Sequence, residues 1–148
     1  ADTVMTCLSK GLGCPVGSLV AASRKRIEEA RRVRKLLGGG MRQAGILAAA
    51  GLWAVDDAMQ RLTEDHSRAR RLGDALGRSP GVRVTLPQTN IVVADLETRS
   101  APDAVATLGE RGVLGIAMDS RTLRLVTHRD VSEEDCTRAI EVIGAVFG

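Results

Sequence analysis

Ser9-Lys10-Gly11-Leu12-Gly13-Cys14-Pro15-Val16-Gly17-Ser18 is the stretch of this chain that is most specific for a fold. An apolar run at residues 4–8 precedes it and predicts a buried strand, while the glycines and the proline predict a tight loop. Burial and nearby cations disfavour the charged form of an ammonium group, so a lysine at a strand end is placed to lose its proton. Lys10 is therefore a candidate amine for attack on a carbonyl group. The alternative is a surface lysine beside an ordinary hairpin turn.

The glycine spacing excludes two nucleotide-binding loops. A Walker A loop places its lysine after the glycines and follows it with Ser or Thr, whereas Lys10 precedes the glycines. The dinucleotide-binding fingerprint is G-x-G-x-x-G before a helix. Here the spacing from Gly11 to Gly17 is one residue longer, and residues 19–22 predict another strand.

Three segments in order carry a resemblance that covers the chain from end to end. They are the lysine segment at 9–18, Arg34-Lys35-Leu36-Leu37-Gly38-Gly39-Gly40-Met41-Arg42-Gln43-Ala44-Gly45, and Arg124-Leu125-Val126-Thr127-His128. Together they resemble the threonine aldolases, which are fold-type I pyridoxal-phosphate enzymes. One departure is Cys14, at a position where the family pattern favours a small residue such as Ala. A thiol there fits sterically and removes no assigned role.

The resemblance implies an α/β fold, namely the C-terminal part of a fold-type I enzyme. Residues 1–78 would form the end of the large cofactor-binding domain, and residues 79–148 a small C-terminal α+β domain. The chain has 148 residues, less than half of a typical family member, and it begins at Ala1 without Met. We therefore expect a C-terminal portion that lacks the first half of the site and is inactive alone.

The first half of the chain predicts two long helices. Residues 25–37 have an amphipathic pattern, and three consecutive glycines stop that helix. A second helix is predicted over residues 41–65, with helical character that can continue to Leu76. Its first three turns are apolar nearly all round, which predicts burial on every side. The small residues Ala44, Ala48, Ala50 and Gly51 let another backbone approach, either at a subunit interface or in a core.

The second half predicts a small sheet with helices on one face. Strands are expected at residues 82–86, 90–96, 113–118 and 123–127, and a helix at 101–111 that Gly112 closes. A last helix begins after Ser132, whose hydroxyl can cap it. The acidic residues 133–135 then favour its positive N-terminus.

Lys10 and Arg124 are the two residues to which the resemblance gives reacting or substrate-binding roles. Lys10 would form the Schiff base with pyridoxal phosphate. Alternation along strand 123–127 sends Arg124 to the face opposite Leu123 and Leu125, where its guanidinium can bind the substrate carboxylate through two hydrogen bonds. The alternative for Arg124 is an ordinary surface ion pair.

Lys35 and Arg42 lie on either side of the triple glycine. By resemblance they approach the cofactor phosphate or a catalytic water, in the neighbouring subunit of an oligomer. A helix N-terminus preceded by glycines attracts anions, and Arg42 adds charge there. The alternative is that both residues solvate helix ends. His66 is given no role and His128 only a weak one.

The implied reaction is cleavage of L-threonine or L-allo-threonine to glycine and acetaldehyde, by an enzyme that acts as a homo-oligomer, a dimer or a tetramer. The alternatives are another lyase reaction on the same scaffold, β-elimination or phenylserine-type aldol cleavage, and a non-catalytic module. Contacts to the substrate side chain would come largely from the part of the family sequence that this chain lacks.

Composition limits the other function classes. The net charge is +3 and the pI about 9.1, but Glu28 and Glu29 can pair with nearby arginines, and the chain has only one Trp, one Phe and no Tyr for base stacking. We expect neither nucleic-acid binding nor a membrane span, because the longest apolar stretch is residues 46–55. Three widely spaced cysteines predict no disulfide framework and no metal site, and a reducing cytoplasm.

Overall fold

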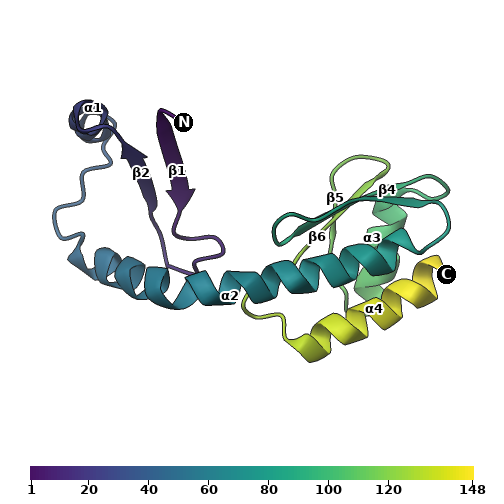
Figure 1. Ribbon diagram of the computed structural model, residues 1–148. Coiled ribbons are helices and arrows are strands. Elements are labelled where there is room, and N and C mark those ends of the chain that lie inside the picture. The colour runs from purple at the N-terminus through teal and green to yellow at the C-terminus, as the bar shows by residue number, and fades with distance from the viewer. The chain divides into compact units, whose positions relative to one another are not determined.

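The computed structural model describes the chain from Ala1 to Gly148 apart from the side chains of residues 58–60. The chain divides into two compact units, Ala1–Gln60 and Arg61–Gly148 (Figure 1). Residues 61–77 thus pack with the C-terminal unit, although they precede the boundary at 78/79 that we predicted for the longer protein. That boundary stays a prediction. Each unit is described by itself.

The first unit begins with a β-hairpin that carries the lysine loop. Strand β1 (Thr3–Cys7) pairs antiparallel with β2 (Ser18–Ala22), and Cys7 lies opposite Ser18 at the loop end. Both strands were predicted from the sequence, but the predicted burial of the strand at residues 4–8 is wrong for this chain, because Val4 is 57% and Met5 62% exposed. The backbone amide of Leu8 donates to the Gly17 carbonyl at 2.9 Å, which extends the pairing into the loop.

Helix α1 (Arg24–Leu36) ends at the triple glycine, as predicted. Gly38 has φ +80°, a left-handed conformation that glycine adopts without a side-chain clash. The amide of Gly39 donates to the Arg34 carbonyl at 2.8 Å, and that of Gly38 donates to the Lys35 carbonyl at 3.2 Å. These two bonds form a Schellman motif, which satisfies carbonyl groups of the last helical turn.

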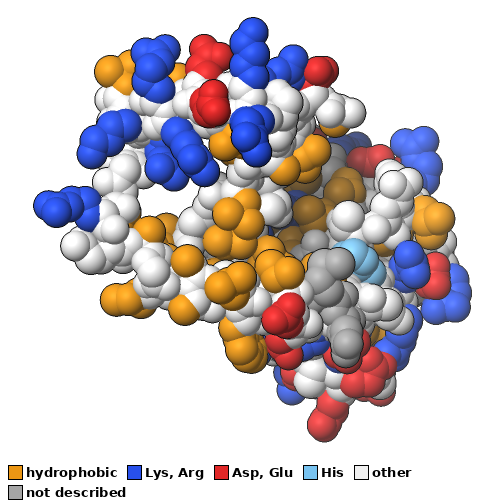
Figure 2. All heavy atoms as spheres, turned by 60° about the vertical axis from the view of Figure 1, so that its left-hand side comes forward, with side chains coloured by type: hydrophobic (Ala, Val, Ile, Leu, Met, Phe, Trp, Pro, Cys, Tyr) orange, Lys and Arg blue, Asp and Glu red, His pale blue; other side chains and the backbone are white. Residues whose placement is uncertain are grey.

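Helix α2 (Gly45–Gly77) is a single helix, so the predicted continuation past residue 65 is confirmed. The prediction that its apolar start is buried on every side is wrong for this chain. Gly51 and Ala54 are buried, but Ile46 is 81% exposed and Leu52 72% exposed. Figure 2 shows such hydrophobic side chains, in orange, at the surface. Within the first unit, Leu8 and Cys14 of the lysine loop pack against Ala54, and a Cβ on Gly51 would lie 3.4 Å from Leu8 Cδ1.

The second unit is a four-stranded antiparallel sheet with helices on one face, as predicted (Figure 1). Every second strand residue points into a core shared with α2, α3 and α4, and this alternation leaves the other face open. In the described part of the chain, no helix is both long and apolar enough to cross a membrane. The strand order is β3-β4-β6-β5, and the elements are β3 (Val82–Thr85), β4 (Ile91–Leu96), α3 (Ala101–Glu110), β5 (Ile116–Ala117), β6 (Thr122–Val126) and α4 (Glu133–Phe147).

Strand β5 is shorter than the predicted 113–118. Gly112 has φ +81°, and the amide of Val113 donates to the Leu108 carbonyl at 2.9 Å, so these residues close α3 instead of joining the sheet. The start of α4 agrees with its prediction. The Asp135 amide donates to Ser132 Oγ at 3.0 Å, and the Ser132 amide donates to Asp135 Oδ2 at 3.1 Å, which is a capping box.

Candidate functional site

Lys10 lies in the turn that opens the lysine loop. Its carbonyl accepts a hydrogen bond from the Gly13 amide at 2.9 Å, and its side chain is exposed. Within the described residues, no hydrogen-bond or ion-pair partner holds its amine. The burial that we expected around this lysine is not found in this structure. What the structure does show is an accessible primary amine at a strand end.

The base of the lysine loop is anchored to α2 within the first unit. Leu8 and Cys14 are each 7% exposed and pack with Ala54, and the Cys14 thiol lies 3.6 Å from the Ala50 carbonyl. Gly17 has φ +129°, and a Cβ there would lie 3.1 Å from Leu8 Cδ1. The loop therefore needs glycine at this position. Cys14 fits sterically, as expected.

Lys35 and Arg42 are exposed cations of the first unit. The Lys35 side chain lies over the triple glycine, because a Cβ on Gly40 would be 3.0 Å from Lys35 Cδ and 3.7 Å from Nζ. Arg42 lies in the turn just before Gly45, where α2 begins. Among the described residues neither cation is engaged in an ion pair. Both are therefore available to an anion.

Arg124 lies on the open face of the sheet, at the centre of β6. Leu123 and Leu125 are buried beneath the helices, so the predicted alternation is confirmed. The residue is half-buried, and its Nε atom is fully buried without a hydrogen-bond partner. The described residues supply it with no ion pair, so the alternative of a surface ion pair is not what this structure shows.

Two polar clusters that sequence reasoning missed fix the ends of β6. Before the strand, Asp119 Oδ1 accepts from the amides of Arg121 and Thr122, each at 2.8 Å. These bonds hold the pKa of Asp119 below its ordinary value, with the Arg121 amide as the largest cause. The Asp-Ser-Arg-Thr segment is a local turn signal that could have identified this cluster.

After the strand, Thr127 is buried and bonded to α2 and to Asn90, the residue that precedes β4. Its hydroxyl donates to the Asp65 carbonyl at 2.6 Å, its carbonyl accepts from Asn90 Nδ2 at 2.7 Å, and its amide donates to the Asn90 carbonyl at 3.0 Å. No local sequence pattern indicates these bonds, because the partners are 62 and 37 residues away. The strand that carries Arg124 is thus held at both ends.

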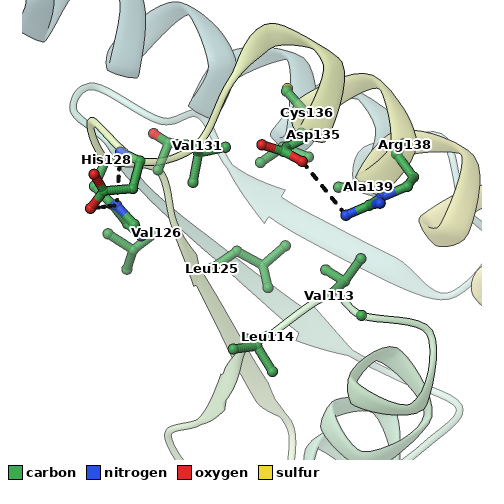
Figure 3. A pocket seen from close by; sticks show the side chains of 14 residues that line it. Val113, Leu114, Leu125, Val126, His128, Val131, Asp135, Cys136, Arg138 and Ala139 are labelled. Atoms are coloured by element: carbon green, nitrogen blue, oxygen red, sulfur yellow. Dashed lines mark hydrogen bonds and ion pairs between the residues drawn. The ribbon is translucent and has the colours of Figure 1, made fainter.

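A separate cavity of about 340 Å³ lies on the helix side of β6 (Figure 3). Leu125 and Val113 line it together with Cys136 and Arg138 of α4. His128, at the end of β6, also lines it, and its Nδ1 lies 3.6 Å from a carboxylate oxygen of Asp130. Since Leu125 and Arg124 point to opposite faces, this cavity is distinct from the open face. It contains none of the four candidate site residues.

Comparison with known proteins gives a consistent set of similarities. Residues 1–99 match the model of the family described as beta-eliminating lyase. A low-specificity L-threonine aldolase of Escherichia coli is 47% identical over 137 residues, which are 90% of this chain and 39% of that protein. Low-specificity L-threonine aldolase 1 of Arabidopsis thaliana is 42% identical over 140 residues, which are 91% of this chain and 39% of that protein.

The fold matches a solved structure of a protein assigned as an L-allo-threonine aldolase, from Listeria monocytogenes. The TM-score is 0.77 at 16% identity, and the match covers 98% of this chain and 44% of that one. The architecture is therefore that of the C-terminal part of a fold-type I pyridoxal-phosphate enzyme. The chain spans about two fifths of the length of the curated relatives it matches.

Proposed function

This chain belongs to the beta-eliminating lyase family, and we propose that it forms the C-terminal part of a longer enzyme that cleaves L-threonine or L-allo-threonine to glycine and acetaldehyde. The observation that carries this proposal is an accessible, unpartnered lysine amine on a loop anchored at its base. Relatives named threonine aldolases, at 42% and 47% identity, support the substrate class.

The residues present suit pyridoxal phosphate. Lys10 offers a primary amine without a competing partner among the described residues, and the exposed cations Lys35 and Arg42 suit a phosphate group. When bound, the cofactor supplies an aldehyde that links to amines and an electron-accepting ring that stabilises negative charge at the Cα of an amino acid. Lys10 would hold the cofactor covalently, and Arg42 and Lys35 would neutralise charge on its phosphate.

Arg124 would bind the substrate carboxylate. A guanidinium presents two parallel N–H donors to a carboxylate, which fixes the orientation of the amino acid as well as its position. Arg124 stands on a strand held at both ends, and within the described residues it is not neutralised by an acidic side chain. Its role is therefore to bind and orient the substrate rather than to move a proton.

We extend the proposal to assembly and compartment. In a homo-oligomer, a dimer or a tetramer, Lys35 and Arg42 would serve the site of the neighbouring subunit. The cysteine pattern supports a reducing, cytoplasmic setting. Mixing a Lys10→Ala protein with an Arg42→Ala protein tests the shared site, since restored activity in the mixture requires the two subunits to contribute different residues.

A β-elimination is the second candidate, because the matching family model carries that name. Product analysis on the full-length protein that contains this segment separates the two reactions. Glycine and acetaldehyde formed from threonine support aldol cleavage, whereas ammonia and a keto acid support elimination. Lys10→Ala is the matched variant, and it abolishes either reaction. If the full-length protein releases neither set of products, the proposed function is wrong and a non-catalytic module remains.

A further inference from the structure

We propose that Val93 and Ile116 are positioning residues that keep water away from the stem of Arg124 and hold its guanidinium in one orientation for a carboxylate. The proposal rests on the proposed function of Arg124 and adds two residues to it. Val93 lies on β4 and Ile116 on β5, the two strands that flank β6.

The strand register places both residues directly opposite Arg124. Val93 pairs with it from β4, and Ile116 pairs with it from β5. Side chains directly opposite in an antiparallel sheet have Cβ atoms about 4.5–5.5 Å apart and stand on the same face. The arginine stem is therefore flanked on the open face of the sheet by two branched apolar side chains, of which Val93 is half-buried and Ile116 is 56% exposed.

Only the inner part of the Arg124 guanidinium, next to the arginine stem, is buried. Nε is fully buried and has no hydrogen-bond partner, while the two terminal nitrogens are not among the buried unpartnered atoms of the described residues. An N–H group that is buried without an acceptor costs free energy, and an apolar side chain at position 124 would avoid that cost. Binding of a ligand by the two terminal nitrogens of the Arg124 guanidinium would offset this cost.

Neither of the nearby acidic groups forms an ion pair with Arg124 in the described part of the chain. Asp95, on the same face of β4, has its Oδ1 3.3 Å from Thr122 Oγ1, whose proton is donated to the nearer Asp119 Oδ2 at 2.8 Å. Glu97 pairs with Arg83, with Nε and Oε1 3.2 Å apart. A ligand carboxylate therefore meets a guanidinium that no described side chain neutralises. Apolar neighbours also lower the local dielectric, which strengthens an ion pair.

The position of Ile116 depends on Gly115. A Cβ on Gly115 would lie 2.8 Å from Leu125 Cδ2 and 3.2 Å from Leu123 Cδ1, so only a glycine lets this segment lie so close to β6. The two-residue strand that follows brings Ile116 beside Arg124. The close approach of Gly115 to β6 thus places Ile116 next to Arg124 in the candidate site.

The test uses Val93→Thr in the full-length protein, because threonine keeps the shape of valine and adds one hydroxyl. Ile116→Thr is the second variant, and Ile91→Thr is the matched control, since Ile91 lies on the same face of β4 but pairs with Val126. We expect Val93→Thr to raise KM for threonine about 3- to 10-fold with kcat within about twofold. Inhibition by threoninol, which lacks the carboxylate, should change less than about twofold.

A second measurement does not depend on activity. The Hε proton of Arg124, assigned by its loss in Arg124→Lys, should exchange with water slowly, and roughly tenfold faster in Val93→Thr but not in Ile91→Thr. If this proton exchanges as fast in the unchanged protein as in an exposed arginine, the positioning proposal is wrong. It is also wrong if threoninol inhibition weakens as much as threonine binding, or if Ile91→Thr raises KM equally. Absence of threonine cleavage would refute the proposed function but not slow exchange of Hε.

Discussion

The hydroxyl of Thr127 donates a 2.6 Å hydrogen bond to the backbone carbonyl of Asp65 and so ties the end of β6 to helix α2. Thr127 is 1% exposed. Arg124 lies three residues earlier on the same strand, so this bond supports the segment that carries the candidate carboxylate-binding residue.

Replacing Thr127 by Val removes this bond while keeping the side-chain shape. We expect Thr127→Val to lower the free energy of unfolding by about 1–2 kcal/mol, because a buried hydrogen bond is lost. Urea titration measures the difference. Thr107→Val is the control, since Thr107 donates a similar bond at 2.8 Å to the Asp103 carbonyl, but this bond is exposed to solvent and Thr107 itself is only half-buried. Equal losses in the two variants would contradict the structural importance of the Thr127–Asp65 bond.

Replacing Gly115 and Gly109 by alanine should change the free energy of unfolding in opposite directions. Gly115→Ala places a methyl group against two buried leucines and should cost about 1–3 kcal/mol of unfolding free energy. Gly109 lies in α3 with nothing within 4 Å of a Cβ, so Gly109→Ala should stabilise the protein by up to about 1 kcal/mol. Denaturant midpoints with unchanged m-values measure both. If Gly115→Ala leaves the free energy of unfolding unchanged, β5 can move away from β6 without a loss of stability, and the prediction is wrong.

The stability of the folded protein should depend on pH in the range below the ordinary pKa of Asp135. Hydrogen bonds from the side chain and the amide of Ser132 hold the pKa of Asp135 below its ordinary value of 3.8. The folded protein therefore binds fewer protons at Asp135 than the unfolded chain does, and stability rises with pH in this window. The contribution is present above pH 3.8 and is lost as the pH falls through the lowered value.

The measurement is the thermal midpoint from pH 6 to pH 2.5, compared with Asp135→Asn. This variant should lose less stability across that range than the unchanged protein does. Asp74→Asn is the control, because Asp74 is exposed on α2 and makes no interaction with the described residues. An unchanged pH profile for Asp135→Asn would show that the capping box does not depend on the carboxylate charge.

Arg124→Lys tests the recognition of the carboxylate in the full-length protein. Lysine keeps the charge but presents no planar pair of donors, so KM for threonine should rise roughly 10- to 100-fold. Arg138→Lys is the matched control, since Arg138 lies on α4 and lines the cavity on the other side of the sheet. Steady-state kinetics measure both. Equal KM values for Arg124→Lys and the unchanged enzyme would remove Arg124 from substrate binding.

Local patterns predicted most of the fold because the controlling interactions are local. The capping box at Ser132 and the glycine stops at Gly38 and Gly112 involve residues within a few positions of one another. The short strand β5 and the bonds of Thr127 could not be predicted in this way. Gly115 packs against β6, and Thr127 bonds to a helix 62 residues away, so both depend on the assembled sheet.

The sequence was enough to predict which residues form the candidate site, but not which of them are buried or exposed. Alternation along β6 correctly placed Arg124 on the face away from Leu123 and Leu125. The exposure of Lys10, and of Ile46 on α2, could not be derived from periodicity, since periodicity identifies an apolar face but not what covers it.

The central claim is that Lys10 binds pyridoxal phosphate covalently. The most direct test adds the cofactor to the full-length protein, reduces it with borohydride and maps the labelled peptide by mass spectrometry. The account predicts one label, on Lys10, and no label in Lys10→Ala, while Lys25→Ala, an exposed lysine on α1, keeps it. A folded full-length protein whose Lys10 stays unlabelled, or whose label lies on Lys35, would contradict the account.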